Sequence, residues 1–562
     1  MVNWQSKKLG DVLGLCNVLA LLVLLNLVSS FYFFRIDLTE EKRYTIKAPT
    51  KEMLGRLDDE VYVEVFLAGD LNAGFTRLQK SVREILEEFR VYSANRVRYT
   101  FTNPTAARSQ QAQAEFARDL AARGVQMLPV IENRDGERIE KVVFPGAIVS
   151  YGGMETGVML FKGNRAQNAQ EVLNQSVEGL EYELASAIAR LSSEERKSVT
   201  LLTGHGEIDS LQIGSLRAAL DEMYDVARVD ISEVRQLPQT DVTILAKPVF
   251  TFSESDKLKL DQYLMRGGRL LLFIDRLDAR MDSASRPDYF AFAYETGLED
   301  QLFRYGLRVN PNLVQDAVAA KYPVVTGKVG NQPQIMQMDW PFFPLANGNP
   351  DHIITRNLDR SLARFASAID TVKALGVKKT PLLFTSPYAR SITAPVKVSV
   401  NDLRGKLDPS QFNAGPLPLA WLLEGTFTSL YRNRFLPAGA VQTDFLEQSV
   451  ATKIIVVADG DFVKNDVNPR NGQVQQLGLD PFSGYTFANQ DVVLNMVSYL
   501  ADDGGLINTR SKEVKIRPLD RQKIREGKVY WQMLNIGLPL VALVVFGLVR
   551  AWYRRRKYAR FA

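Results

Sequence analysis

Cysteine and histidine are nearly absent from this sequence, which has one cysteine and two histidines among its 562 residues. The single Cys16 excludes an intramolecular disulfide framework. A structural zinc site takes about four closely spaced ligands, and Cys16, His205 and His352 are far apart along the chain. We therefore expect no disulfide, no metal site and no cofactor.

Motifs of the common catalytic machineries are also missing. There is no G-x-x-x-x-G-K-[ST] phosphate loop, so the chain is not the ATPase of a transporter, and energy has to come from a partner. There is no G-x-S-x-G or H-E-x-x-H motif either, and we predict that the protein is not an enzyme. The net charge of +5, from 69 basic and 64 acidic residues, is too small a bias for a nucleic-acid-binding protein.

The chain is long enough for several folded units. A domain of about 100 to 200 residues predicts roughly three or four units in this length. The hydrophobic fraction of 46% and the charged fraction of 24% are typical of a globular protein. This composition argues against both a disordered chain and a polytopic membrane body.

Two apolar stretches near the chain ends predict transmembrane helices. Val12–Phe34 and Val529–Val549 contain no charged residue, have aromatic residues at their edges, and reach the roughly 20 residues that a helix needs to cross a bilayer. A cleaved signal peptide is the alternative for the first stretch, but its apolar run is long and no small-x-small site follows it. We expect a two-pass protein whose helices contact the lipid bilayer.

Basic residues at the outer ends of the two stretches favour cytoplasmic termini. They are Lys7, Lys8, Arg554, Arg555, Arg556 and Lys557. The inner flanks are also basic, so local charge counts by themselves favour neither orientation, but long loops are translocated largely regardless of charge. We place the body, which is the part of the chain between the two helices, on the periplasmic, extracytoplasmic side of the cytoplasmic (inner) membrane. Residues 1–35 then hold a short cytoplasmic stub and helix, residues 504–528 a charged stalk, and residues 529–562 the second helix and a basic cytoplasmic tail.

Residues 36–195 are predicted to form a thioredoxin-like α/β domain without redox cysteines. Apolar residues alternate at 61–65 and 97–101, and between them they recur at helical spacing from Phe75 to Phe89, which predicts a βαβ unit. Short strands are expected around 126–131, 141–151 and 157–161. A helix is expected over 177–191.

Residues 196–503 are predicted to form a doubly wound α/β domain, with a parallel sheet covered by helices on both faces. Strands are expected at 199–202, 226–229, 242–245 and 270–274, with helices at 213–224 and 253–266. A strand at 453–457 and a helix at 491–500 resume the sheet after an insertion at 277–449. Two aromatic-rich runs of the insertion, 338–352 and 421–434, are interpreted as ordered but irregular structure.

One loop has residues typical of a ligand site. Gly204, His205, Gly206 and Glu207 follow the first strand of the second domain, and open α/β sheets bind ligands at the carboxyl ends of their strands. Asp459 and Asp461 follow the strand at 453–457, so all six residues are expected to line one cleft for a small molecule or polymer. A histidine near carboxylates can also act as a base or cation ligand. The alternative is structural, with turn glycines, a backbone-bonded His205 and capping aspartates.

Six runs in order along the chain resemble a known family. They are DLTEEKRYT (37–45), GHGE (204–207), LLEGTFTS (422–429), ADGDF (458–462), FANQDVVLNMVSYL (487–500) and SKEVKIRPLD (511–520). Between two terminal helices, this set resembles the GldG-type family, the gliding-motility-associated auxiliary components of bacterial ABC transporters. The resemblance implies a separate ABC ATPase and a polytopic ABC permease as partners, and no catalytic residues. It also implies a glutamine-amidotransferase-like fold for residues 196–503, although the nucleophilic cysteine of such enzymes has no counterpart in the body of this chain.

Three functions are consistent with these features. The leading prediction is a non-catalytic, membrane-anchored extracytoplasmic auxiliary or binding subunit of an ABC-type transport system, whose two helices contact the permease. The second is a membrane-tethered hydrolase or sugar-processing enzyme that uses His205 with Glu207, Asp459 or Asp461. The third is a scaffold protein of the cell envelope.

Overall fold

The computed structural model describes most of the chain in two compact units. The described residues are 7–31, 45–104, 109–134, 137–162, 169–193, 196–329, 332–404, 408–437, 444–502, 505–506, 509 and 527–558. The first unit is 1–512 and the second is 513–562. The predicted stalk and the runs 37–45 and 511–520 lie almost entirely outside the described residues.

A helix occupies each end of the chain. Helix α12 (Lys528–Tyr558) contains the candidate span Lys528–Arg556, in which an 18-residue window has a mean hydropathy of 2.1 and is 0% buried, so it is long and apolar enough to cross a membrane. It is the one such helix among the described residues. Helix α1 (Lys7–Phe31) has a shorter described apolar segment, Leu13–Leu24, and the first membrane span stays a prediction.

The basic residues that predict orientation belong to these end helices. Arg554, Arg555 and Arg556 are exposed on α12, whereas the side chains of Lys7, Lys8 and Lys557 lie outside the described part of the structure. The two-pass topology and the side on which the body lies therefore stay predictions.

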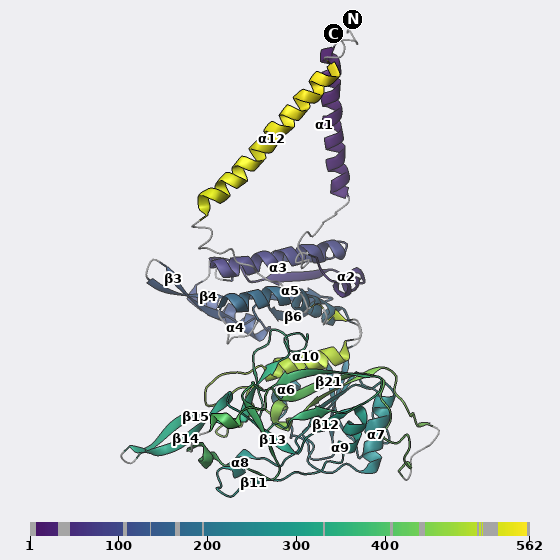
Figure 1. The fold of residues 1–562 in the computed structure, drawn as a ribbon, viewed down its shortest axis with the longest axis vertical. Helices are drawn as coiled ribbons and strands as arrows, with labels where there is room; N and C mark the ends of the chain where they lie inside the picture. The colour runs from purple at the N-terminus through teal and green to yellow at the C-terminus, as the bar shows by residue number, and fades with distance from the viewer. Residues whose placement is uncertain are drawn as a thin grey trace. The chain divides into compact units, whose positions relative to one another are not determined.

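The first sheet confirms the predicted βαβ unit. Its order is β2-β1-β5-β6, in which β1 pairs in parallel with β2 and antiparallel with β5. The strands are β1 (Val61–Val65), β2 (Val97–Phe101), β5 (Gly146–Tyr151) and β6 (Met154–Met159). Helices α3 (Ala73–Tyr92) and α5 (Ala169–Ser192) lie side by side along this sheet (Figure 1).

Apolar periodicity explains these elements. The Asn72 side chain accepts a hydrogen bond from the Phe75 backbone N–H at 3.0 Å and caps α3 at its N-terminus. Buried residues from α3, α5, β1 and β5 form one core, because each element presents one apolar face to it. They include Leu78, Val82, Leu86, Leu180, Leu184, Ile188, Val61, Val63, Val65 and Val149.

Smaller elements complete this half of the body. They are helices α2 (Ala48–Gly55) and α4 (Gln110–Ala122) and the hairpin of β3 (Leu128–Arg134) with β4 (Glu137–Val143). The run predicted as one strand at 141–151 is divided between β4 and β5. Pro145 lies at the division, and a proline has no backbone N–H to donate to a ladder.

The second sheet has 10 strands among the described residues, in the order β14-β15-β18-β21-β22-β10-β9-β7-β8, with β16 paired to β15. From β22 to β8 neighbouring strands are parallel, as predicted. These strands are β7 (Ser198–Thr203), β8 (Asp225–Asp230), β9 (Val242–Ala246), β10 (Leu270–Phe273) and β22 (Thr452–Val457). The associated helices are α6 (Gly214–Asp221), α7 (Glu254–Met265) and α10 (Asn489–Ala501).

The insertion at 277–449 supplies the other half of this sheet, so the prediction of a wholly parallel sheet was incomplete. Its strands β21 (Pro418–Gly425), β18 (Val377–Phe384), β15 (Gln332–Gly348) and β14 (Ala319–Val329) pair antiparallel in series beyond β22. The prediction of irregular structure for 338–352 and 421–434 was wrong over β15 and β21. Buried Trp340, Phe342 and Phe343 outweigh the prolines of β15.

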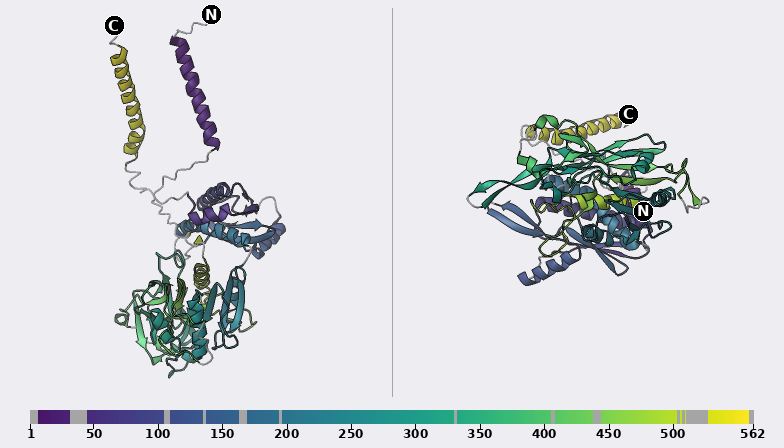
Figure 2. Two further views of the ribbon diagram at one scale, coloured as in Figure 1. Left: turned by 90° about the vertical axis from the view of Figure 1, so that its right-hand side faces the viewer. Right: turned by 90° about the horizontal axis from the view of Figure 1, so that it is seen from below.

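Several short elements surround this sheet. They are strands β11 (Phe290–Ala291), β12 (Leu307–Val309), β13 (Asn312–Asp316), β16 (Ser361–Leu362), β17 (Ile369–Thr371), β19 (Ala389–Thr393) and β20 (Val396–Lys397), helices α8 (Met281–Ala284) and α9 (Glu299–Tyr305), and 3-10 turns at Val400–Arg404, Pro409–Gln411 and Gly460–Val463. The long hairpin of β14 and β15 extends past the neighbouring strands (Figures 1 and 2). The Tyr182 hydroxyl of α5 lies 3.1 Å from Ser498 Oγ of α10. This hydrogen bond connects the helix layer of the first sheet to a helix of the second sheet.

Candidate functional site

The loop after β7 forms a tight turn around His205. Gly204 and Gly206 have φ angles of +123° and +75°, which favour glycine. A Cβ on Gly206 would lie 2.9 Å from the Phe250 ring, so this position also requires the absence of a side chain. The His205 carbonyl accepts hydrogen bonds from the Val249 and Phe250 backbone N–H groups, both at 2.8 Å. These contacts hold the loop against the chain that follows β9.

The His205 side chain is buried between an aromatic ring and a carboxylate. Its ring stacks on Phe252 with centroids 3.6 Å apart, and Nε2 lies 3.5 Å from Asp256 Oδ2. Burial lowers the pKa of His205, and the opposing attraction of Asp256 does not reverse this shift. Burial of the ring thus favours the neutral form of the imidazole. Asp256 in turn accepts from Ser253 Oγ at 2.7 Å and Lys259 Nζ at 2.8 Å.

Glu207 faces inward at the end of the same turn. One carboxylate oxygen accepts from the His205 backbone N–H at 2.9 Å, and burial raises the pKa of Glu207. The cavity that Glu207 lines has a volume of about 20 Å³. Such a space holds about one water molecule. The described geometry of this loop thus agrees with the structural alternative, in which glycines and backbone bonds shape a turn.

Asp459 and Asp461 belong to a buried charge cluster after β22. The cluster is centred on Lys247, whose Nζ lies 2.7 Å from Asp461 and 3.0 Å from Asp275. Burial opposes the charged form of Lys247, but the two carboxylates outweigh it and raise its pKa. Asp459 is 1% exposed, and burial together with the neighbouring carboxylates raises its pKa well above the usual range. One Asp459 oxygen accepts from the Arg364 backbone N–H at 2.7 Å.

The six predicted residues therefore fall into two groups. His205 contacts the chain after β9 and the start of α7, and Glu207 accepts from the His205 backbone. Asp461 pairs with Lys247, directly after β9, and Asp459 accepts from the backbone of Arg364. No hydrogen bond or ion pair among the described residues joins the two groups. Likewise, in that part of the chain no group of three or more His, Cys, Asp or Glu residues is placed to hold a metal ion. A common ligand cleft for the six residues stays a prediction.

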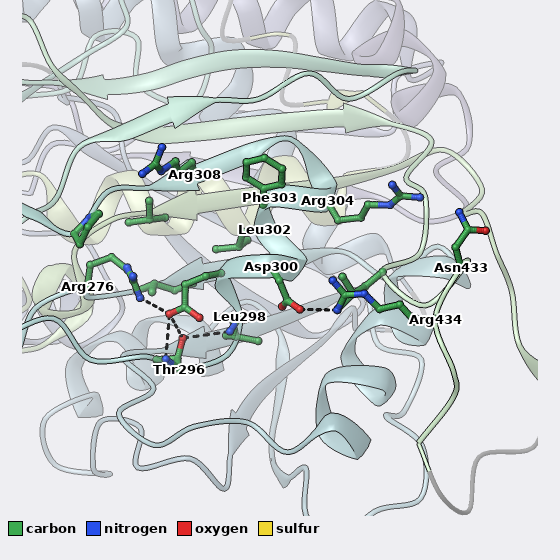
Figure 3. Close-up of a pocket in the computed structure, with 15 residues that line it drawn as sticks. Arg276, Thr296, Leu298, Asp300, Leu302, Phe303, Arg304, Arg308, Asn433 and Arg434 are labelled. Atoms are coloured by element: carbon green, nitrogen blue, oxygen red, sulfur yellow. Dashed lines mark hydrogen bonds and ion pairs between the residues drawn. The ribbon is translucent and has the colours of Figure 1, made fainter.

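A larger cavity lies elsewhere on the same edge of the sheet (Figure 3). Its volume is about 610 Å³, and its wall begins at Ile274 and Arg276, directly after β10. Helix α9 and strand β12 supply nearly half of the wall, and Leu430 and Arg434 come from the chain after β21. No sequence motif indicates this cavity, because its wall combines residues from 274–276, 296–311 and 430–434, which belong to different elements.

Charged residues in the cavity wall include four arginines and two carboxylates. Arg276 pairs with Glu299, and Arg434 lies 2.8 Å from Asp300, which also contacts Lys257 at 3.0 Å. Neither Arg304 nor Arg308 has an ion pair with any residue that the structure describes. The cavity wall thus has two arginines whose charge no described carboxylate compensates. The segment 298–308, which supplies much of this wall, has two acidic and two basic residues and contains no known motif.

Comparisons with known proteins point to transport. A family model described as "ABC-type uncharacterized transport system" matches residues 196–496, and a model described as a domain of unknown function (DUF7088) matches residues 40–150. An uncharacterized protein of Borreliella burgdorferi is 20% identical over 576 residues, covering 98% of this chain and 100% of that protein. The structure of the mmIFT52 N-terminal domain is 13% identical, covers 54% of this chain and 96% of that chain, and has a TM-score of 0.29, which is too low to support an argument.

Proposed function

The chain belongs to the ABC-type uncharacterized transport system family, an ABC transporter auxiliary family, and on this basis we propose that it is a non-catalytic, membrane-anchored subunit that works with a separate ABC ATPase and a polytopic permease. The family match over more than half of the chain is the observation that carries this proposal. The absence of a phosphate loop from the sequence supports it, because energy then has to come from another subunit.

We propose that α12 and α1 anchor the chain in the cytoplasmic membrane, with the body on the extracytoplasmic side. The apolar surface of α12 supports this, because Leu543, Phe546 and Leu548 are exposed, at 67%, 65% and 65%. Apolar helices that cover nothing else are stable in a lipid environment. The same helices are the surfaces that we propose contact the permease.

The finer resemblance also belongs to this proposal. We propose a GldG-type, gliding-motility-associated subunit in which residues 36–195 are thioredoxin-like and residues 196–503 are amidotransferase-like with an insertion at 277–449. The β1-α3-β2 unit and the parallel strands from β22 to β8 support these assignments. The enclosed surroundings of His205 and Glu207 argue against the hydrolase alternative, because the cavity of about 20 Å³ beside Glu207 is too small for a sugar substrate.

Affinity purification tests the partnership. The tagged full chain, solubilised in a non-ionic detergent from its native membranes, is expected to recover an ATPase with a phosphate loop and a multi-span permease, which mass spectrometry would identify. The matched control replaces the apolar residues of 529–549 with leucine, which keeps the helix long and apolar but removes its specific surface. We expect this control to stay in the membrane and to recover less permease. Repeated recovery of neither partner with the unaltered chain would contradict the proposal.

Cysteine labelling tests the orientation, and the single native cysteine makes it simple. In a Cys16→Ser background, a Leu375→Cys variant is expected to react with a membrane-impermeant maleimide in intact spheroplasts, because Leu375 is 83% exposed between β17 and β18. An Arg555→Cys variant, exposed on α12, is expected to react only after permeabilisation. Gel-shift labelling with a polyethylene glycol maleimide measures both. The opposite labelling pattern would place the body in the cytoplasm.

A further inference from the structure

The 610 Å³ cavity lies where an α/β fold is suited to bind a ligand. Its wall includes Ile274 and Arg276, immediately beyond the carboxyl end of β10. Open α/β sheets bind ligands outside the carboxyl ends of their strands. The volume also falls within the roughly 300 to 1,000 Å³ of small-molecule sites. The cavity therefore has the position and the size of a small-molecule site.

The charges around the cavity select the sign of the ligand. Arg276 and Arg434 are already paired with Glu299 and Asp300 on the lower side in the view of Figure 3. Arg304 and Arg308 have no such pairing among the described residues, and both side chains are exposed. A guanidinium binds a carboxylate, phosphate or sulfonate through two parallel hydrogen bonds. The two exposed guanidinium groups thus favour an anion.

Apart from Thr296 and Asn433, the remaining wall of the cavity is apolar. The ring of Phe303 lies between Arg308 and Arg304 in the view of Figure 3 and is 52% exposed. Leu298, Leu302, Val309, Pro311 and Leu430 complete the apolar surface. An exposed aromatic ring beside guanidinium groups can stack on a planar organic anion. Sulfate has no planar apolar part and cannot form this contact.

From this arrangement we propose that the cavity binds a small organic anion, with its acidic groups on Arg304 and Arg308 and its aromatic or aliphatic body against Phe303. The wall of this site contains no residue of the His205 loop or of the Lys247 cluster. An auxiliary subunit with such a site has a direct means of sensing or presenting an anionic solute.

Fluorescence anisotropy of pyranine, a pyrene trisulfonate, tests the site on the purified full chain in a non-ionic detergent. We expect saturable binding by the unaltered chain and a dissociation constant at least about tenfold higher for the Arg304→Gln/Arg308→Gln variant, because both anion partners are lost. Phe303→Ala is expected to weaken binding as well. Raising the salt from about 0.1 M to about 1 M shortens the Debye length from about 10 Å to about 3 Å and should also weaken binding.

A matched control has the same change in charge at a distance from the cavity. Arg235 and Arg286 are exposed and outside the cavity wall, so Arg235→Gln/Arg286→Gln should bind pyranine as the unaltered chain does. Equal loss of binding in this control and in the cavity variant would overturn the proposal. Displacement of pyranine by equimolar inorganic sulfate would overturn the role of the apolar wall. Thermal unfolding of all variants verifies that they are folded.

Discussion

Replacing Lys247 with methionine is expected to lower the free energy of unfolding by about 3 to 5 kcal/mol, because it leaves buried carboxylates without their cation. The Lys247 side chain is 20% exposed, and Nζ lies within 3.0 Å of both Asp275 and Asp461. Asp275 also accepts from the Gly460 backbone N–H at 2.5 Å. The lysine thus holds together the loops after β9, β10 and β22. Thermal unfolding followed by intrinsic fluorescence measures the effect.

An exposed lysine is the matched control for this change. Lys378 is 76% exposed and 4.0 Å from Glu424, so Lys378→Met should cost no more than about 1 kcal/mol. The double variant Lys247→Met/Asp461→Asn should recover part of the loss, because one of the unpaired carboxylates is then neutral. Similar unfolding midpoints for Lys247→Met and Lys378→Met would show that the cluster does not stabilise the sheet edge.

Replacing Asp261 with alanine should also destabilise the body strongly, because several buried donors depend on this carboxylate. Asp261 is 0% exposed and accepts from Ser429 Oγ at 2.7 Å, the Tyr305 hydroxyl at 2.8 Å and the Leu430 backbone N–H at 2.9 Å. Each buried donor left unsatisfied costs about 1 to 3 kcal/mol. We therefore expect a loss of about 3 kcal/mol or more, measured by chemical denaturation.

The hydrogen bonds of Asp261 also connect the stability of the body to the cavity. Their donors include Tyr305, the last residue of α9, and Leu430, which is part of the cavity wall. Asp261→Asn keeps one acceptor oxygen and should be less destabilising than Asp261→Ala. Burial raises the pKa of Asp261, so its ionised form is already costly, and asparagine removes that cost. The exposed control Asp288→Ala is expected to change stability by about 0.5 kcal/mol or less. Equal effects of Asp261→Ala and Asp288→Ala would refute the dependence on buried donors.

Local apolar patterns were sufficient to predict the parallel strands and the helices that cover them. The alternation of Val61, Val63 and Val65 places every second side chain in the core, and β1 has the predicted buried and exposed positions. Helix α3 likewise buries Leu78, Val82 and Leu86 on one face. These elements are predictable because the signal lies within a few consecutive residues.

The antiparallel half of the second sheet was not predictable in this way. Strand β15 contains prolines that normally argue against a strand, and its Trp340 is 1% exposed in a core with Phe343 and Phe365. The stabilising contacts come from residues distant in sequence, so no local window contains them. The division of the predicted strand at 141–151 has a local cause instead, because Pro145 has no backbone N–H for a strand ladder.

Residue types and motifs were sufficient to predict an auxiliary subunit of a transport system and to draw attention to the loop of His205. Both inferences depend only on the identity and the order of the residues. The pairing of Lys247 with Asp275 and Asp461 and the union of Arg276, Arg304 and Arg434 in one cavity wall arose only on folding. Side chains from separate segments meet because the carboxyl ends of neighbouring strands converge on one sheet edge, and the order of strands in a sheet is set by long-range packing.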